Sequence, residues 1–403
     1  MSPPLIALFI AAFAFGTTEF VIAGVLPEVA AGLRFGVPAA GYLVSAYALG
    51  IAIGGPVLTI ATARLSRRSL IVGLVIAFTV GQAACALAPD FGSMLLFRFL
   101  TAIAHGTYFG VAMVVAVGLV AEAQRGRAVA FVLAGLTVSN IVGVPAGTAI
   151  GAFWGWQATF WATFILGLAA LAAVIALLPR AKAATPAAPT TLGSEMRVLA
   201  RQQVWSSLIV MLMLMMAQFV PFTYIAPMLR NVTHLGEDWV PWVLLLIGFG
   251  STIGVFCGGR LADWKPMPAL VAMMILQAAV MGSIYLASPY ALPMIVLLVL
   301  WGGLNFSIGT TIQTRILAWT ADAPNIAASL IPSGFNVGIA LAASIGAQLL
   351  DGGYGYRSLP LLGVVSMLAG TLVAFLSAMA EGGAARLPPV GKSLHPVPTP
   401  PEY

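Results

Sequence analysis

Long apolar stretches dominate this chain and constrain its fold more than any other feature. Twelve of them come close to the length of about 20 apolar residues that a helix needs to cross a bilayer. We expect spans at 5–29, 40–62, 70–88, 94–120, 128–151, 158–178, 204–229, 240–259, 268–287, 291–315, 326–350 and 359–380. Only 7% of the residues are charged, against about a quarter in soluble chains, so there is too little polar surface for a soluble enzyme. The sequence predicts an all-α membrane protein with twelve transmembrane helices surrounded by a lipid bilayer.

A stretch rich in Ala, Thr and Pro divides the twelve spans into two sets of six. This stretch, 179–203, contains three prolines and four basic residues. We therefore expect an N-terminal six-helix bundle at 1–178, a linker at 179–203 and a C-terminal six-helix bundle at 204–380. The remaining tail, 381–403, is rich in proline and is expected to be disordered.

The basic residues fall mainly on one side of the predicted membrane. Fourteen of the 18 lysines and arginines lie on the side of the linker and both termini, three (Arg34, Arg230 and Arg357) lie on the other side, and Arg98 lies within a span. Loops rich in Lys and Arg stay in the cytoplasm, so we expect a multi-pass protein of the bacterial cytoplasmic (inner) membrane with both termini inside. This topology explains the formal net charge of +6 without a nucleic-acid partner.

The two halves of the chain resemble each other at a fixed offset. At an offset of 200, Gly50 matches Gly250, Gly54 matches Gly254, Pro27 matches Pro227, and His105 matches Asn305. A repeat of this length predicts two pseudo-symmetric six-helix bundles in the same orientation. Transporters built in this way hold their substrate near the membrane midplane, between the halves.

Glycines recur at every fourth position in two of the spans. These are Gly143, Gly147 and Gly151, with Pro145 beside them, and Gly250, Gly254 and Gly258. Small residues on one face let helix backbones approach closely. The stripes indicate either static helix packing or a contact that slides as the halves move.

Two charged side chains are expected inside the membrane, Glu19 in span 1 and Arg98 in span 4. Ionisable residues in spans are costly and usually functional. Burial disfavours the charged form of a carboxylate, so Glu19 can take and release a proton as its exposure alternates, and its charge can also pair with a cationic substrate. Arg98 either faces the substrate cavity, pairs with a carbonyl group, or extends its head toward the interface.

Several neutral polar residues lie within the same spans. His105 either relays protons together with Glu19 or forms a neutral hydrogen bond between helices. Amide groups facing lipid would be unsatisfied, so we expect a substrate cavity lined by Arg98, Tyr108, Asn140, Gln218, Tyr224, Asn305 and Asn336, with Tyr47 and Phe222 as further aromatic candidates.

Three motifs in the first half resemble the major facilitator superfamily, specifically its twelve-span drug:proton antiporter branch. Residues 16–27 (GTTEFVIAGVLP) are similar to the span-1 signature of sugar-efflux and chloramphenicol-efflux members. Residues 105–110 (HGTYFG), after Arg98, are similar to the bacterial arabinose-efflux type. Residues 143–148 (GVPAGT) resemble the span-5 antiporter motif, with a valine before the proline in place of the usual glycine. The resemblance implies a twelve-helix carrier that exchanges protons for a small organic solute.

The signature loop of that family occurs in the second half as Gly259 to Asp263 (GRLAD). In the first half, Thr59 and Ala63 replace the glycine and the aspartate, while the basic Arg67 and Arg68 remain among the residues that follow. The resemblance implies that the loop carboxylate pins neighbouring cytoplasmic helix ends in the outward-open state. Asp263 is then the carboxylate that remains for this role.

Proton-coupled efflux of a drug or sugar by a monomer is the leading interpretation, and proton-coupled uptake is the alternative within the carrier class. A polytopic membrane enzyme would need a clustered catalytic set, and a channel would not need duplicated halves. The sequence shows no HExxH motif, no paired intramembrane carboxylates and no Cys/His cluster, so we expect neither enzyme activity nor a metal site. It also shows no Walker A motif and no other cofactor motif.

Overall fold

The computed structural model describes residues 2–62, 64–121, 124–179, 197–264, 266–320 and 324–382. Within these ranges the chain forms helices and turns and no strand, and twelve helical segments are long and apolar enough to cross a membrane. The predicted fold class is confirmed. Most of the predicted linker (180–196), the loop residue Ala63 and the tail from residue 383 onward lie outside the described ranges.

The first six spans are built from eleven helical elements. They are α1 (Pro3–Val21) with η1 (Ile22–Gly24); α3 (Val37–Leu49), η2 (Gly50–Gly54) and α4 (Gly55–Ala61); α5 (Arg67–Ala86); α6 (Phe91–Gly118); α7 (Arg125–Val138), η4 (Ser139–Gly143) and α8 (Val144–Trp154); and α9 (Trp156–Leu177). The turn before α9 requires a glycine, because Gly155 has a φ of +86°.

The second six spans are more regular. They are α11 (Gln202–Thr223); η6 (Glu237–Trp239) with α13 (Val240–Trp264); α14 (Pro266–Ala287); α15 (Ala291–Trp319); α16 (Pro324–Asp351); and η7 (Tyr356–Ser358) with α17 (Leu359–Gly382). Three short helices lie outside the spans: α2 (Leu26–Gly32), η5 (Arg197–Ala200) and α12 (Ile225–Asn231). Large apolar side chains such as Val57, Ile60 and Phe256 are more than half exposed, as expected of helices that face lipid.

The internal repeat is visible in the packing of the helices. A Cβ atom on Gly50 would lie 2.6 Å from the carbonyl oxygen of Phe99, and one on Gly250 would lie 2.5 Å from that of Val299. Gly50 and Gly250 are 200 residues apart, and so are their contact partners Phe99 and Val299. The same close approach joins η2 to α6 in the first half and α13 to α15 in the second. The predicted duplication into two pseudo-symmetric bundles is confirmed.

Spans 1 and 7 end earlier than the sequence predicted, and the two breaks lie at nearly equivalent positions of the two halves. The predicted spans 5–29 and 204–229 are interrupted at Val25 and Tyr224, where a new short helix begins. Pro27 and Pro227 follow these breaks in the first turns of α2 and α12. Proline has no N–H group to continue a preceding helix but fits the first turn of a new one.

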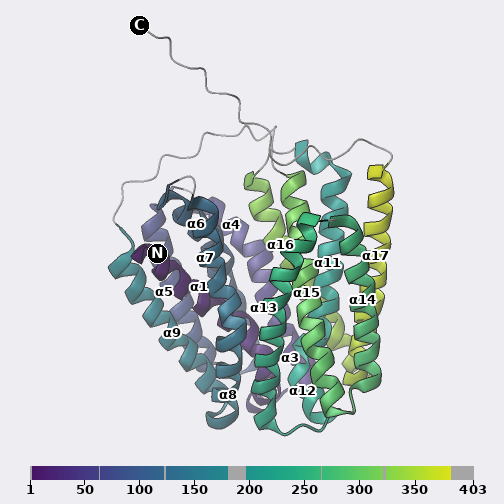
Figure 1. Cartoon of the computed structure of the whole chain (residues 1–403). Helices are drawn as coiled ribbons and strands as arrows, with labels where there is room; N and C mark the ends of the chain where they lie inside the picture. Colours follow the sequence, from purple (N-terminus) through teal and green to yellow (C-terminus); the bar gives the residue numbers. More distant parts are fainter. Residues whose placement is uncertain are drawn as a thin grey trace.

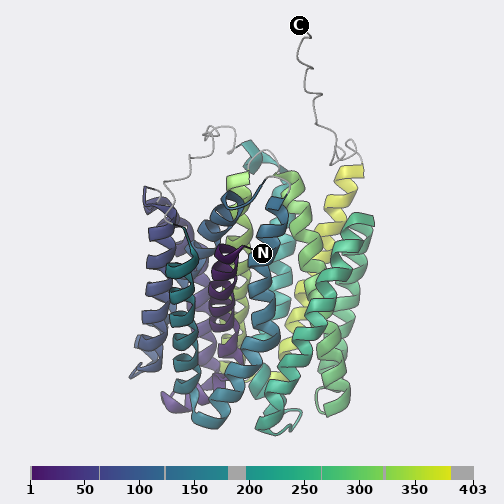
Figure 2. The ribbon, with the colours of Figure 1, turned by 60° about the vertical axis from the view of Figure 1, so that its left-hand side comes forward.

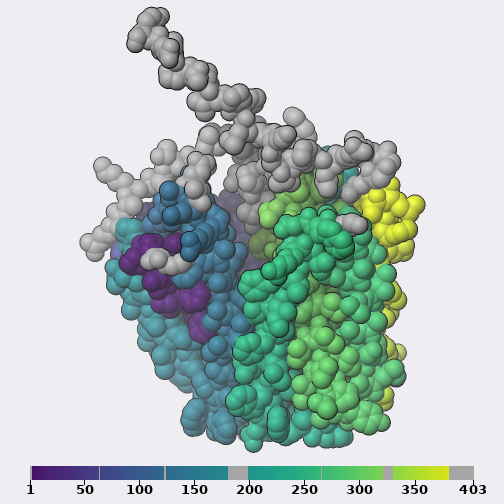
Figure 3. Space-filling view, viewed as in Figure 1, coloured from purple at the N-terminus to yellow at the C-terminus, as the bar shows by residue number. Residues whose placement is uncertain are grey.

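The two halves stand side by side, and all long helices run between two opposite ends of the molecule (Figures 1 and 2). We call the end at which α1 begins and α17 ends the terminal face. The opposite end carries α12 (Figure 1) and α2, which contacts α12, and is called the distal face. In the space-filling view the halves are in close contact along the distal part of their boundary (Figure 3).

Candidate functional site

Hydrogen bonds between the halves close the boundary toward the distal face. Ser45 of α3 donates to the carbonyl oxygen of Ala340 in α16 at 2.9 Å. The Tyr224 hydroxyl donates to the Pro38 carbonyl oxygen at 3.0 Å. Tyr224 therefore contributes to this closure and does not line the cavity for which the sequence suggested it.

An ion pair at the distal face reinforces the closure. The guanidinium of Arg230 in α12 contacts the Glu28 carboxylate in α2 at 2.5 Å and the Glu237 carboxylate at 3.1 Å. The side chains of Arg230 and Glu28 are 14% and 18% exposed. This pair joins the two halves, and local sequence gives no sign of it because the two charges are about 200 residues apart.

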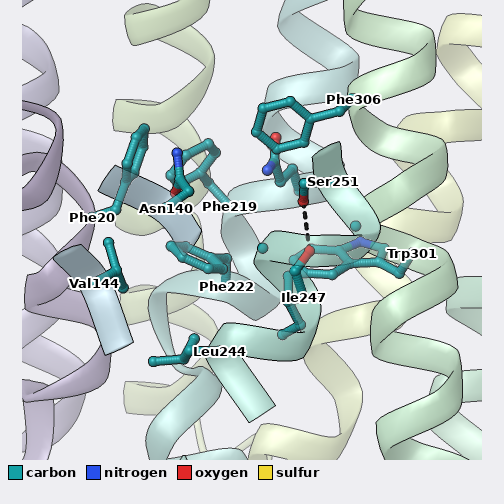
Figure 4. A pocket seen from close by; sticks show the side chains of 13 residues that line it. Phe20, Asn140, Val144, Phe219, Phe222, Leu244, Ile247, Ser251, Trp301 and Phe306 are labelled. Carbon is teal, nitrogen blue, oxygen red and sulfur yellow. Dashed lines mark hydrogen bonds between the residues drawn. The ribbon is translucent and has the colours of Figure 1, made fainter. Parts of the chain in front are cut away.

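A cavity lies at the boundary between the halves (Figure 4). The N-terminal half contributes Phe20, Asn140 and Val144. The C-terminal half contributes Gln218, Phe219, Phe222, Leu244, Ile247, Gly248, Ser251, Trp301, Gly302 and Phe306. Most of the wall therefore belongs to α11, α13 and α15.

Two of the predicted cavity residues line this cavity, and a third lies directly behind it. Asn140 and Gln218 are lining residues. Asn305 donates from Nδ2 to the carboxamide oxygen of Gln218. Asn140 lies in η4, a π-helical turn within span 5. Such turns are rare and often occur at functional sites.

The other predicted cavity residues lie elsewhere in this conformation. The Tyr108 hydroxyl donates to the Leu8 carbonyl oxygen at 2.6 Å, inside the N-terminal bundle. The Asn336 amide donates to the Pro332 carbonyl oxygen of its own helix at 3.0 Å. Arg98 is fully buried, so its head does not extend to the membrane interface.

Glu19, His105, Tyr47 and Arg98 form one buried polar network in the N-terminal half. His105 Nε2 lies 3.7 Å from Glu19 Oε2. On the other side of the imidazole ring, Nδ1 lies 2.9 Å from the Tyr47 hydroxyl. The side chains of His105 and Glu19 are 5% and 12% exposed. The structure therefore gives Glu19 a partner that the sequence did not reveal, because His105 is on a different span.

Arg98 is the basic member of this network. Its guanidinium lies 4.2 Å from the centre of the Tyr47 ring and donates from Nη1 to the Thr18 carbonyl oxygen at 3.0 Å. It also interacts electrostatically with Glu19. A fully buried cation is costly unless an opposite charge compensates it. The protonation of Glu19 is thus coupled to the stability of Arg98 at its site.

The C-terminal half repeats this arrangement without the charges. Glu19 and His105 join α1 to α6, and Gln218 and Asn305 join α11 to α15. The repeat places these pairs at equivalent positions, since His105 matches Asn305 and Gln218 is one residue from the match of Glu19. One half therefore holds an ionisable pair and the other holds an amide pair beside the cavity.

The predicted glycine stripes pack within each half. A Cβ atom on Gly147 would lie 2.6 Å from a Val21 methyl group, and Gly143 packs against Thr17, both on α1. Pro145 is buried beside them, in the first turn of α8. The close approach between the halves involves Gly248, where a Cβ would lie 2.8 Å from the Asn140 carbonyl oxygen. In this conformation each stripe packs against a helix of its own half, and Gly248 lies at the contact between the halves.

The residues of the signature loops lie near the terminal face. Arg68 donates from Nε and Nη2 to the carbonyl oxygens of Leu178 and Ile175, both at 2.8 Å. It thereby satisfies free carbonyl groups at the end of α9. Arg67 begins α5, and Gly259 has open space around its Cα. Asp263 is exposed in the last turn of α13.

Most aromatic side chains of the cavity wall were not predictable from the sequence. Five aromatic side chains line the cavity: Phe20, Phe219, Phe222, Trp301 and Phe306. Of these, only Phe222 was expected there from the sequence. The internal repeat gave one clue to the position of Phe219. This residue lies 200 residues after Glu19 and is therefore its equivalent in the second half. In an apolar span, however, nothing distinguishes a cavity-facing Phe from a lipid-facing one.

Comparisons with known proteins give a consistent result. The model of the Major Facilitator Superfamily matches residues 8–318. The chain is 36% identical over 375 residues to the inner membrane transport protein YdhP of Escherichia coli (strain K12), covering 93% of this chain and 96% of the relative. It is 33% identical over 352 residues to a chloramphenicol resistance protein of Streptomyces lividans, covering 87% and 90%.

Solved structures share the fold. A bacterial homologue of the human lysosomal transporter Spinster, in an inward-facing and occupied conformation, superposes with a TM-score of 0.76 over 93% of this chain and 96% of that one. The sequence identity is 15%. The unoccupied form of that homologue gives a TM-score of 0.68.

Proposed function

The chain belongs to the major facilitator superfamily, and we propose that it is a secondary active transporter that exports a small organic solute in exchange for protons. Its similarity to an inner membrane transport protein and to a chloramphenicol resistance protein supports transport in the cytoplasmic membrane and favours export. The same family membership points to a transporter rather than an enzyme. The proposed substrate is a drug-like or sugar-like molecule.

The observation that carries this proposal is the buried pair of Glu19 and His105 next to the cavity. Glu19 belongs to the polar network of the N-terminal half, and the next residue, Phe20, lines the cavity. A change in the charge of Glu19 alters the balance with Arg98, and α1 transmits the resulting movement to the cavity wall. Proton binding and substrate binding are thereby coupled through one helix.

The distal closure supports a cytoplasm-facing state for this structure. The bias of basic loops toward the terminal face supports a cytoplasmic location of this face, and the contacts of Tyr224 and of Arg230 close the opposite side. In the proposed cycle, substrate enters from the cytoplasm while Glu19 is ionised. After the distal side opens, a proton from outside neutralises Glu19 and the substrate leaves.

A pH gradient imposed on proteoliposomes tests the proposal and its alternative. For an exporter, protons moving down their gradient drive the labelled substrate in the opposite direction, so acid-inside vesicles accumulate it against its own gradient. A symporter would move substrate in the same direction as protons and would empty these vesicles. Accumulation that is insensitive to the pH gradient would contradict coupling of either kind.

The orientation of the chain is a separate prediction. We expect single cysteines placed in the 180–196 segment, in a Cys85- and Cys257-free background, to be protected from an impermeant thiol reagent in intact cells. They should react fully after the membrane is permeabilised, because the basic residues of this region keep it in the cytoplasm. Labelling in intact cells would reverse the proposed orientation.

A third prediction concerns Asp263. Its carboxylate is exposed in this distal-closed structure, and we propose that it stabilises the opposite conformation through charge-assisted hydrogen bonds to a helix N-terminus or to a nearby arginine. Asp263→Asn should slow transport, since that state loses such a bond, and leave substrate binding intact. Rates in vesicles and binding to the purified protein measure the two effects, and equal losses in both would argue against a latch.

A further inference from the structure

The cavity between the halves contains no ionisable side chain. Its 13 lining residues are aromatic, aliphatic, glycine, amide or hydroxyl residues. Glu19, His105 and Arg98 lie behind the wall, in the N-terminal bundle, and belong to a network of their own. A charged ligand in this cavity would lose its water without gaining a counter-ion, which is costly. The lining therefore selects against cations and anions alike.

Aromatic rings form the two facing sides of the cavity. Phe20 of the N-terminal half lies 5.9 Å from Phe219 and 6.4 Å from Phe222, measured between ring centres. Phe222 in turn stacks on Trp301 at 6.3 Å with an angle of 29° between the rings. Figure 4 shows Phe20 on the side opposite Trp301, with Phe222 between them. In this conformation the cavity has a free volume of about 30 Å³, room for about one water molecule, so a flat ring enters beside Phe222 only when the halves move apart. There it would gain the stacking energy that these rings have with each other.

Two buried polar atoms, one in the wall and one directly behind it, have no hydrogen-bond partner among the described residues. They are Nε1 of Trp301, whose side chain lines the cavity, and Oδ1 of Asn305. Trp301 and Asn305 are 1% and 2% exposed. A buried group without a partner is unfavourable, so a ligand that offers a hydrogen-bond acceptor to the Trp301 indole is favoured. Gln218, which accepts a hydrogen bond from Asn305, adds an amide group at the same place.

We infer that the substrate is an uncharged, planar aromatic molecule with hydrogen-bonding groups, held mainly by the C-terminal half while the N-terminal half carries the proton. This inference rests on the proposed function in so far as it takes this cavity as the transport site. It departs from direct pairing of a cationic substrate with Glu19. According to this inference, the substrate and the proton occupy separate sites. The two sites adjoin at Phe20, which lines the cavity and directly follows Glu19 in the sequence.

Ligands that differ only in charge provide the test. One-, two- and three-ring aromatic compounds would each carry a primary amide, a carboxylate or a trimethylammonium group, and their equilibrium binding to the purified full-length chain would be measured. We expect the amides to bind about tenfold or more tightly than the matched ions, since nothing in the cavity replaces the water lost by a charge. Stronger binding of either ion series, or no binding of any amide, would overturn the inference.

Two variants locate the binding at this cavity. Trp301→Phe keeps a ring but removes the indole donor, so it should weaken amide binding about tenfold and leave ring compounds without polar groups unaffected. Phe306→Leu should weaken all ring compounds alike. Trp161→Phe, at an exposed position of α9, is the matched control. If Trp161→Phe and Trp301→Phe weakened the binding of the amides equally, the ligand would not bind at this cavity.

The binding measurement needs neither a proton gradient nor a transport direction. If the amides bind as expected but no pH-driven movement is found, the coupling proposal fails and the ligand class stands. If pH-driven transport is found for a cationic or anionic substrate, the coupling proposal stands and the inference about the ligand fails.

Discussion

Glu19→Gln should reduce pH-driven accumulation of substrate in proteoliposomes to the background level of vesicles without protein. The substitution keeps the size of the side chain and removes the proton-binding carboxylate next to His105. A permanently neutral residue cannot alternate between charged and uncharged forms, so the proton gradient loses its point of action. Exchange of labelled for unlabelled substrate in the absence of a gradient should continue.

Asp238→Asn is the matched control for this experiment. It makes the same chemical change at an exposed residue of η6, outside the cavity. Its accumulation should equal that of the unmodified chain. If Glu19→Gln still accumulates substrate with an unchanged pH dependence, the proton path does not include this carboxylate, and His105 becomes the next residue to test.

Gly248→Val should push the two halves apart beside the cavity and thereby favour opening of the distal side. A Cβ atom at this position would lie 2.8 Å from the carbonyl oxygen of Asn140 and 3.0 Å from the Cα atom of Ile141, both on the opposite half. These are backbone atoms, which cannot move aside as a flexible side chain would. Overpacking of this kind costs about 1–3 kcal/mol, which shifts the population of the closed state about 5- to 150-fold. Transport should fall accordingly, because the cycle requires this closure.

Labelling of a cysteine at the distal contact measures this shift. Ser45→Cys, in a chain without the two native cysteines, is buried when the halves are closed. It should react faster with an impermeant reagent in Gly248→Val. Gly73→Val is the matched control, since a Cβ atom there meets nothing within 4 Å. Unchanged labelling in a folded Gly248→Val chain would show that this contact does not govern distal closure.

The coarse architecture was predictable from the sequence because the bilayer acts on each segment separately. Every span must be apolar over about 20 residues and must satisfy its backbone groups internally. The twelve spans and the duplication were therefore visible without any knowledge of contacts. The ends of spans 1 and 7 were placed too far along the chain, although Pro27 and Pro227 marked the start of new helices.

The partners of the polar residues were not predictable in the same way. Glu19 and His105 were both recognised as ionisable residues within spans, but their approach to 3.7 Å depends on the packing of α1 against α6. Arg230 was counted only as one of the few basic residues on the side opposite the linker, and Glu28 was not considered, although the structure joins them across the two halves. Contacts of this kind depend on how the two bundles meet, and local sequence does not record it.

The amino-acid sequence was enough to identify a helical membrane protein of two similar halves with a few polar groups in its spans. It did not reveal which of those groups face the cavity, because this depends on how the helices pack. Tyr108 and Asn140 both lie within apolar spans, yet Tyr108 bonds to Leu8 inside one bundle and Asn140 faces the cavity from a π-turn. The reason is physical: a helix that is apolar on all sides gives no pattern from which its rotation can be read, and only packing against its neighbours fixes that rotation.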